Sequence, residues 1–281
     1  MRVNHVLLAI GLFVSAAPAF ADLVFSSPPR ESEAKGKETY QPIADFLSKI
    51  TGQPVKYRYP QDWLIYQSEM QRDIYDIVFD GPHFLSWRVA NLQHTPLVKL
   101  PGALEFVVVV AKDANTIKTL NNLAGRPMCA HAPPNLATLT VMHEFPNPSR
   151  QPVLIDTKGF PAALKGVISG KCVAGILQAK MYKELDTQRE AKVIFKSRPM
   201  PNQAFSSSRR ITPGMQRTIA SALLSPEGQT ATAKLRQEFK AENFIPAGKE
   251  EFAGLNDLLK DTWGFQSRTT VSRVNVPFSS Q

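Results

Sequence analysis

The chain has 281 residues, of which 43% are hydrophobic and 20% are charged. This is the composition of an ordinary globular protein, it argues against large-scale disorder, and the length suffices for two lobes that each bury a core. The formal net charge is +9, but the lysines and arginines are scattered along the chain and form no basic stripe, which argues against nucleic-acid binding.

The N-terminal segment has the features of a secretory signal peptide. Arg2 gives a positive start, residues 6–14 form an apolar run, and Ala19-Phe20-Ala21 is a small-x-small cleavage signal. We therefore expect residues 1–21 to be removed before Asp22, which leaves a soluble exported protein. The apolar run is too short for a permanent membrane span, and no later stretch approaches about 18 consecutive apolar residues. No cysteine stands at the cleavage point, so no lipid anchor is expected.

The first third of the chain alternates strands and helices. The apolar patterns predict strands at 23–27, 55–59 and 76–79, and helices at 40–50, at 62–71 and from about 83 onward. This alternation is the signature of a mostly parallel sheet with helices on both faces. The fold class is therefore α/β.

A second cycle of elements follows the most β-prone run of the chain, Leu104 to Ala111, which we expect to be a central strand. The patterns then predict helices at 116–123, 135–145 and 161–169, strands at 128–130, 153–156, 172–177 and 193–195, an extended run at 203–207, and helices at 213–224, 226–240 and 249–260. The two cycles indicate two similar lobes, with the chain crossing between them near 105–112 and near 198–208.

These crossings give the predicted domain organisation. Lobe 1 is expected to be discontinuous, with residues 22–105 and 206–265, and lobe 2 to comprise residues 106–205. Residues 266–281 have no helical period and are expected to form a surface tail.

A strand-to-helix turn in the second cycle is a candidate ligand site. The strand at 128–130 ends at Ala132-Pro133-Pro134-Asn135, and Asn135 is a favoured helix N-cap, so free N–H groups of the first helical turn suit an anion or a polar ligand head. His131 stands at the carboxyl end of the strand, where open α/β sheets place ligands. Its alternative role is to satisfy loop carbonyls.

The only two cysteines, Cys129 and Cys172, begin two strands that should be neighbours in the second lobe. In an oxidising compartment pairing is the default, so a disulfide is expected. The histidines downstream of the signal segment show no metal-ligand spacing, so neither a metal nor a cofactor is expected.

Four stretches resemble the phosphonate-binding family of periplasmic solute-binding proteins, which feed ABC importers. They are residues 40–55, 59–63 (Tyr-Pro-Gln-Asp-Trp), 75–82 (Tyr-Asp-Ile-Val-Phe-Asp-Gly-Pro) and 169–175 (Ser-Gly-Lys-Cys-Val-Ala-Gly). The resemblance implies a two-lobed fold of the type II periplasmic-binding-protein class, with mostly parallel sheets and a two-strand hinge. It also implies a periplasmic location, a small-molecule ligand held in the interlobe cleft, an inner-membrane permease as partner, and a monomer.

The chain departs from the family at the anion clamp. Where the family has a Ser-Thr-Ser-Gly turn that holds phosphonate oxygens, this chain has residues 132–135, in which two prolines lack N–H groups and the hydroxyls are absent. Where the family has an aromatic residue before a glycine, this chain has Asp80, whose charge would repel a phosphonate by on the order of 1 to 4 kcal/mol at about 4 Å. The resemblance thus implies the scaffold without the clamp.

The remaining cleft positions suggest a cationic or heteroaromatic ligand. Tyr40 or Trp63 is a candidate for stacking on the ligand, and Asp80 for pairing with a cation. The alternatives are that both aromatic residues pack within their own lobe and that Asp80 caps the following helix. Gln178 and Gln203 are further candidate contacts.

The leading hypothesis is a periplasmic solute-binding protein of an ABC importer, which closes two lobes on its ligand and performs no chemistry on it. One alternative is a soluble ligand-sensing partner of a membrane signalling protein. The other is a cleft enzyme that uses a Cys129 thiolate, because some enzymes that split thiamin-like compounds share this two-lobed fold. The only base near Cys129 in sequence is His131.

Overall fold

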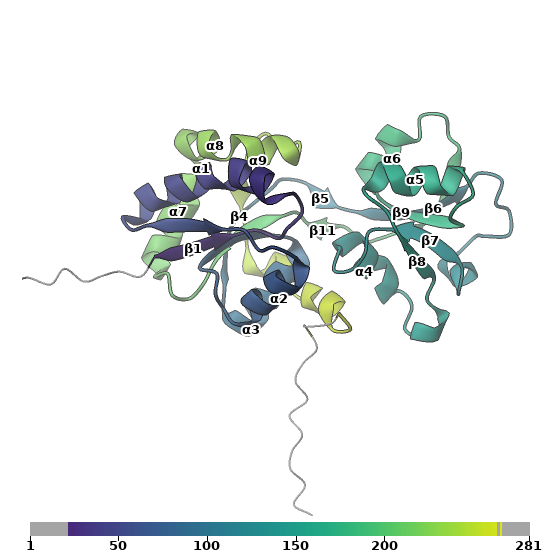
Figure 1. The fold of residues 1–281 in the computed structure, drawn as a ribbon, viewed down its shortest axis with the longest axis horizontal. Coiled ribbons are helices and arrows are strands. Elements are labelled where there is room, and N and C mark those ends of the chain that lie inside the picture. The colour runs from purple at the N-terminus through teal and green to yellow at the C-terminus, as the bar shows by residue number, and fades with distance from the viewer. Residues whose placement is uncertain (1–21, 263–264, 266–281) are drawn as a thin grey trace, which may run out of the picture.

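The computed structural model describes residues 22–262 and residue 265, and it shows two α/β lobes side by side, joined by thin strands (Figure 1). The expected signal segment, 1–21, and the expected tail, 266–281, lie outside the described residues.

Lobe 1 is built on a six-stranded sheet of order β13-β4-β12-β3-β1-β2. Its strands are β1 (Leu23–Ser26), β2 (Val55–Arg58), β3 (Ile77–Asp80), β4 (Thr95–Lys99), β12 (Ala204–Ser207) and β13 (Ile245–Pro246). β1 pairs in parallel with β2 and β3, and β12 enters antiparallel between β3 and β4. The strand that returns from lobe 2 is therefore central to the lobe 1 sheet.

Helices cover both faces of this sheet, as the alternation predicts (Figure 1). The helices of lobe 1 are α1 (Glu33–Thr51), α2 (Trp63–Gln71), α3 (Pro82–Leu92), α7 (Pro213–Leu224), α8 (Pro226–Ala231), α9 (Ala233–Glu238) and the 3₁₀ helices η3 (Lys249–Phe252) and η4 (Leu255–Leu259). α1, α8 and α9 lie on one face and α2 and α3 on the other.

Lobe 2 is built on a five-stranded sheet of order β10-β6-β9-β7-β8. Its elements are β6 (Phe106–Ala111), η1 (Leu120–Leu123), β7 (Pro127–Ala130), α4 (Leu136–His143), η2 (Pro148–Arg150), β8 (Val153–Asp156), α5 (Phe160–Ile168), β9 (Ala174–Gln178), α6 (Ala179–Leu185) and β10 (Ala191–Lys196). α4 packs on one face of the sheet, against Val108 and Val110, and α5 on the other, against Val107 and Val109. Alternate valines of this run therefore pack into two separate hydrophobic clusters, one on each face of the sheet.

A short two-stranded ribbon connects the lobes: β5 (Ala103–Leu104) pairs antiparallel with β11 (Met200–Pro201). The crossing expected at 105–112 is therefore misplaced by a few residues. The apolar run at 106–111 lies wholly inside the lobe 2 sheet, between β10 and β9, because only a paired strand with both faces covered buries five consecutive apolar residues.

Several helix boundaries differ from the sequence expectation. α1 begins at Glu33, seven residues earlier than expected, and its first turns include the ion pair of Lys37 with Glu33 at 2.7 Å. The helix expected at 226–240 is divided at Thr232, and the one expected at 249–260 consists of two 3₁₀ helices separated by Gly254, whose φ is 76°. A left-handed residue cannot continue a helix.

The expected disulfide between Cys129 and Cys172 is present, with the two Cα atoms 5.6 Å apart. Both cysteines are buried beneath α5, where Gly166 leaves room for the sulfur atoms. Neither sulfur is therefore free to act as the thiolate nucleophile of the enzyme hypothesis.

Candidate ligand-binding cleft

A cavity of about 320 Å³ lies between the two lobes beside the connecting ribbon. Its walls combine lobe 1, the ribbon and lobe 2, and they include Arg30, Trp63, Gly81, His83, Leu104, Asn135, Phe160, Gln178, Lys180 and Gln203. A change in the relative position of the lobes would open or close this space.

The cavity lies at the carboxyl ends of the parallel strands. β3 leads into Gly81 and the start of α3, β7 leads into the turn before α4, and β9 leads through Gln178 into α6. In open α/β sheets this edge is where ligands bind, because the loops that follow the strands meet there. The sequence order of strands and helices therefore positions the site.

Two polar contacts join the lobes around the cleft. His83 Nε2 lies 3.1 Å from the carbonyl oxygen of Pro134, and Lys240 Nζ lies 3.0 Å from Glu184 Oε2. Burial lowers the pKa of His83 to about 3, against the opposing effect of its hydrogen bond to Pro134, so the imidazole is neutral near pH 7. Its Nε2–H then donates to the carbonyl of the other lobe.

The N-terminus of α4 has few donors left for an anion. Pro133 and Pro134 have no N–H, the Asn135 N–H donates to the carbonyl of Ala132 at 3.2 Å, and Asn135 Oδ1 accepts from the Ala137 N–H at 3.0 Å. Asn135 is thus the N-cap that the sequence predicts. The N–H groups of Asn135 and Ala137 therefore already have acceptors within the turn, so an anion in this cleft would depend largely on other donors.

Side chains supply positive charge at the cleft instead. Arg30, in the loop after β1, donates from Nη2 to Gln203 Oε1 at 3.3 Å, and its guanidinium lies 5.8 Å from the ring centroid of Phe239. Lys180, at the start of α6, enters the same cavity from lobe 2. Two carboxylates also line the cavity, but Glu184 pairs with Lys240 at 3.0 Å and Glu238 with Lys35 at 3.4 Å. Within the described part of the chain, no carboxylate lies within 4.0 Å of Arg30 or Lys180.

Four residues that the sequence singled out line the cavity: Trp63, Asn135, Gln178 and Gln203. Tyr40 does not, because it is 1% exposed in the lobe 1 core, where its ring stacks on Tyr57 at 5.2 Å between centroids. This matches the alternative that Tyr40 packs within its own lobe.

His131 does not line the cavity either. Its ring is half-buried against Phe160, at 5.4 Å between centroids, and its backbone carbonyl accepts a hydrogen bond from Thr138 Oγ1 at 2.5 Å. Burial lowers the pKa of His131, with the nearby Asp156 carboxylate opposing the shift. The residue supports the turn rather than the cavity wall.

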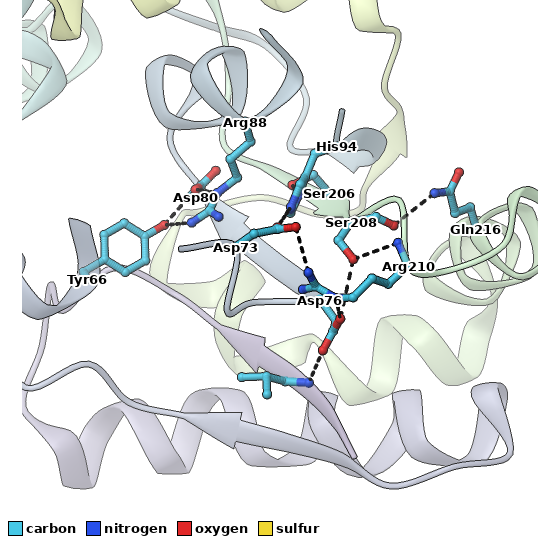
Figure 2. A network of polar contacts seen from close by, with 11 residues as sticks. Tyr66, Asp73, Asp76, Asp80, Arg88, His94, Ser206, Ser208, Arg210 and Gln216 are labelled. Atoms are coloured by element: carbon cyan, nitrogen blue, oxygen red, sulfur yellow. Dashed lines mark hydrogen bonds and ion pairs between the residues drawn. The ribbon is translucent and has the colours of Figure 1, made fainter. Parts of the chain in front are cut away.

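The position of Asp80 contradicts the hypothesis that this carboxylate pairs with a cationic ligand. Its carboxylate is fully buried in lobe 1, where Oδ2 accepts from Arg88 Nε at 3.0 Å and from Tyr66 Oη at 2.7 Å (Figure 2). It makes no cap contact with α3, whose N-cap is Gly81. Both roles predicted for Asp80 are therefore wrong, because a buried arginine on the following helix draws the carboxylate away from the cleft.

Arg30, His83 and Lys180 line the cavity as well, although the sequence pattern did not predict a role for them. The sequence positions of two of them could have indicated a place at the cleft. Arg30 stands in the polar loop directly after the first strand, and His83 follows the Gly81-Pro82 helix start. Lys180 had no local signal, since it differs from other surface lysines only by its place at the cleft.

The described residues contain no cluster of His, Cys, Asp or Glu suited to a metal ion. Within the same residues, no helix has the length and apolar character required to cross a bilayer.

Solved structures of low sequence identity share this fold. XAC2383 from Xanthomonas citri bound to ATP is 13% identical, with a TM-score of 0.67, and the alignment covers 85% of this chain and 97% of that chain. PhnD1 from Prochlorococcus marinus in complex with methylphosphonate is 14% identical, with a TM-score of 0.60 and the same coverage.

A binding protein component of an ABC phosphonate transporter from Pseudomonas aeruginosa, PA3383, is 16% identical, with a TM-score of 0.58. That alignment covers 84% of this chain and 85% of the other. No curated protein matches this chain in sequence.

The family match extends over most of the chain. Residues 25–252 match the family described as the periplasmic substrate-binding protein of phosphonate ABC transporters, and this range takes in both lobes and the connecting ribbon. This protein therefore belongs to the phosphonate-binding family of periplasmic substrate-binding proteins of ABC transporters.

Proposed function

We propose that this protein binds a small anionic or zwitterionic solute in the interlobe cleft and presents it to the permease of an ABC importer. The observation that carries the proposal is the pair of cations, Arg30 from lobe 1 and Lys180 from lobe 2, that line one cavity without a carboxylate partner among the described residues. The family description, which names phosphonate, supports an anionic ligand.

This proposal replaces the cation hypothesis, which depended on Asp80. A unit negative charge about 4 Å from one of these cations gains on the order of 4 kcal/mol at an effective dielectric of about 20. Side chains would thus replace the hydroxyls and N–H groups that the turn at 132–135 lacks. A cavity of about 320 Å³ lies at the small end of ligand sites, which favours a small solute.

Binding would act by closing the lobes about the β5–β11 ribbon. An anion that contacts Arg30 and Lys180 together gains both attractions only when the lobes are close, so it favours the closed form. The contacts of His83 with Pro134 and of Lys240 with Glu184 would break on opening. In this proposal, residues 1–21 direct export and are cleaved, and the mature monomer leaves its ligand chemically unchanged.

Isothermal titration of the mature protein tests the proposal. The panel comprises methylphosphonate, 2-aminoethylphosphonate, phosphate, phosphite and glutamate, with thiamin and spermidine as cationic comparisons. We expect at least one anionic or zwitterionic compound to bind, and Arg30→Gln and Lys180→Gln each to weaken that binding at least about ten-fold, or about 1.4 kcal/mol.

Lys183→Gln is the matched control, because Lys183 lies on the same helix as Lys180 and does not line the cavity. It should leave binding unchanged. Binding of the cations alone, or equal effects of Lys180→Gln and Lys183→Gln, would refute the proposal.

A further inference from the structure

A second cavity, of about 640 Å³, also lies between the lobes. Its walls come from α2, the prolines before α4, α4 itself, the loop at 145–148, and η4 with the residues that follow it. Trp63 and Pro134 line both this cavity and the cleft cavity, so they form the boundary between the two.

The chemistry of this wall differs from that of the cleft cavity. Trp63, Leu139, Met142 and Phe145 supply apolar surface from both lobes, together with several prolines. No lysine or arginine is among the described residues that line it. The two titratable residues of the lining, His143 and Asp261, are both exposed to solvent. The second cavity therefore offers no side chain equivalent to Arg30 or Lys180 for an anion, and its apolar area suits a flat hydrophobic group.

One polar group in this wall has an unmet hydrogen-bonding requirement. Gln67, on α2, is 4% exposed, and its Oε1 has no hydrogen-bond partner in the described structure. Buried side-chain oxygens are almost always paired, because an unpaired one loses its hydrogen bonds to water without replacement. Rotation of the amide about its terminal side-chain bond would turn this oxygen toward the cavity, where a bound group with an N–H or O–H donor would supply the missing partner.

We propose that the second cavity binds an uncharged aromatic group that carries one N–H or O–H donor. The group packs against Trp63 and the apolar side chains of α4, and Gln67 accepts its hydrogen bond. This inference goes beyond the proposed anion site, because Arg30, Lys180 and the other polar residues of the cleft cavity take no part in it.

Titration of the mature protein with N-phenyl-1-naphthylamine tests this inference. The probe is a neutral aromatic amine with one N–H, and its fluorescence rises in an apolar environment. We expect saturable binding of one probe per protein. Gln67→Leu should weaken that binding about five- to ten-fold, the amount expected for one hydrogen bond.

Two further variants separate location from hydrogen bonding. Leu64→Trp adds bulk at a position that lines the second cavity and is 56% exposed, so it should lower affinity without disturbing the core. Gln178→Leu removes the same amide from the cleft cavity alone and should leave probe binding unchanged. Thermal unfolding of each variant checks that it is folded.

Non-saturable binding, or equal losses in Gln67→Leu and Gln178→Leu, would overturn the inference. An effect of Leu64→Trp without one of Gln67→Leu would locate the probe but refute the role of the amide, and the inference would fail as stated. Arg30→Gln should weaken anion binding at least about ten-fold without affecting the probe, so the failure of one proposal is distinguishable from the failure of the other.

Discussion

The interiors of the two lobes are stabilised by different means. Lobe 1 buries charge: Asp80 and Arg88 are both fully buried, and Asp76, 6% exposed, pairs with Arg210 at 2.6 Å (Figure 2). In the described part of lobe 2 no Asp, Glu, Lys or Arg is buried, and the core consists mainly of aliphatic and aromatic side chains and the Cys129–Cys172 disulfide.

This difference predicts which substitutions should most reduce the stability of each lobe. A buried ion pair contributes little net stability over an apolar pair, but the loss of one partner leaves a charge without water or counterion. A disulfide acts mainly by restricting the unfolded chain, so its loss leaves no unpaired charge behind. Lobe 1 should therefore be the more sensitive to single substitutions at polar sites.

Removing the guanidinium of Arg88 should have the largest effect. In Arg88→Leu the Asp80 carboxylate is buried without its partner, and we expect a loss of about 3 to 5 kcal/mol in the free energy of unfolding, measured with urea. Asp80→Leu combined with Arg88→Leu should recover much of that loss, and Arg72→Leu, at an exposed position, should have little effect. Additive losses in the double variant would show that the pair is not coupled.

Removing the disulfide should rank second. Replacing Cys129 and Cys172 together by alanine opens a loop of 43 residues, and we expect a loss of about 2 to 4 kcal/mol. Reductant should lower the unfolding midpoint of the wild-type protein and leave that of the double alanine variant unchanged. A midpoint of the double variant equal to that of the oxidised protein would contradict a stabilising role.

His83 should make stability depend on pH at the boundary between the lobes. Its pKa is about 3 when folded, whereas the ordinary histidine value, which we take for the unfolded chain, is 6.5. The unfolded chain therefore binds a proton below pH 6.5 that the folded protein does not. The stabilisation is present above pH 6.5 and is lost as pH falls toward 3, by about 2 kcal/mol at pH 5.

Urea unfolding at pH 7.5 and pH 5 measures this loss. His83→Gln, which keeps a donor for the Pro134 carbonyl, should show a smaller difference between the two pH values than the wild type. His143→Gln, at an exposed position, is the control. Equal differences in the wild type and His83→Gln would exclude the titration of His83.

Alanine substitutions at two helical glycines should change the free energy of unfolding least. Their comparison tests how closely the chain packs around the disulfide. A Cβ on Gly166 would lie 2.5 Å from Cys129 Sγ, whereas one on Gly214, in α7 of lobe 1, would meet nothing closer than 4.0 Å. Gly166→Ala should cost roughly 1 to 2 kcal/mol by overpacking. Gly214→Ala should gain up to about 1 kcal/mol from helix propensity. Melting temperatures that rise in both variants would contradict the close packing.

The elements and much of the site followed from local patterns. Asn135 is the N-cap because its side chain bonds a backbone group two residues on, which depends on local sequence alone. Trp63, Gln178 and Gln203 line the cavity because the order of strands and helices fixes which loops meet at the sheet edge. The crossing predicted at 105–112 was a few residues out of place. A run of valines indicates that a strand is buried, but it does not indicate to which sheet the strand belongs.

The roles of charged side chains could not be predicted in this way. Asp80 stands at the end of a strand beside the cleft, yet its direction is set by Arg88, which lies eight residues further on, in the following helix. Arg30 and Lys180 are 150 positions apart in sequence and share a cavity only because the lobes face each other. No local pattern contains that information.

The sequence by itself determined the α/β class, the two-lobed organisation and the pairing of the only two cysteines, because periodicity, turn residues and composition act over short distances. The tertiary structure alone decided which charged side chains line the cleft and the presence of a second, apolar cavity. The charged lining depends on which side chains are paired with distant partners, and the apolar cavity depends on which apolar side chains the two lobes leave unburied between them. Burial and ion pairing are both properties of the assembled fold.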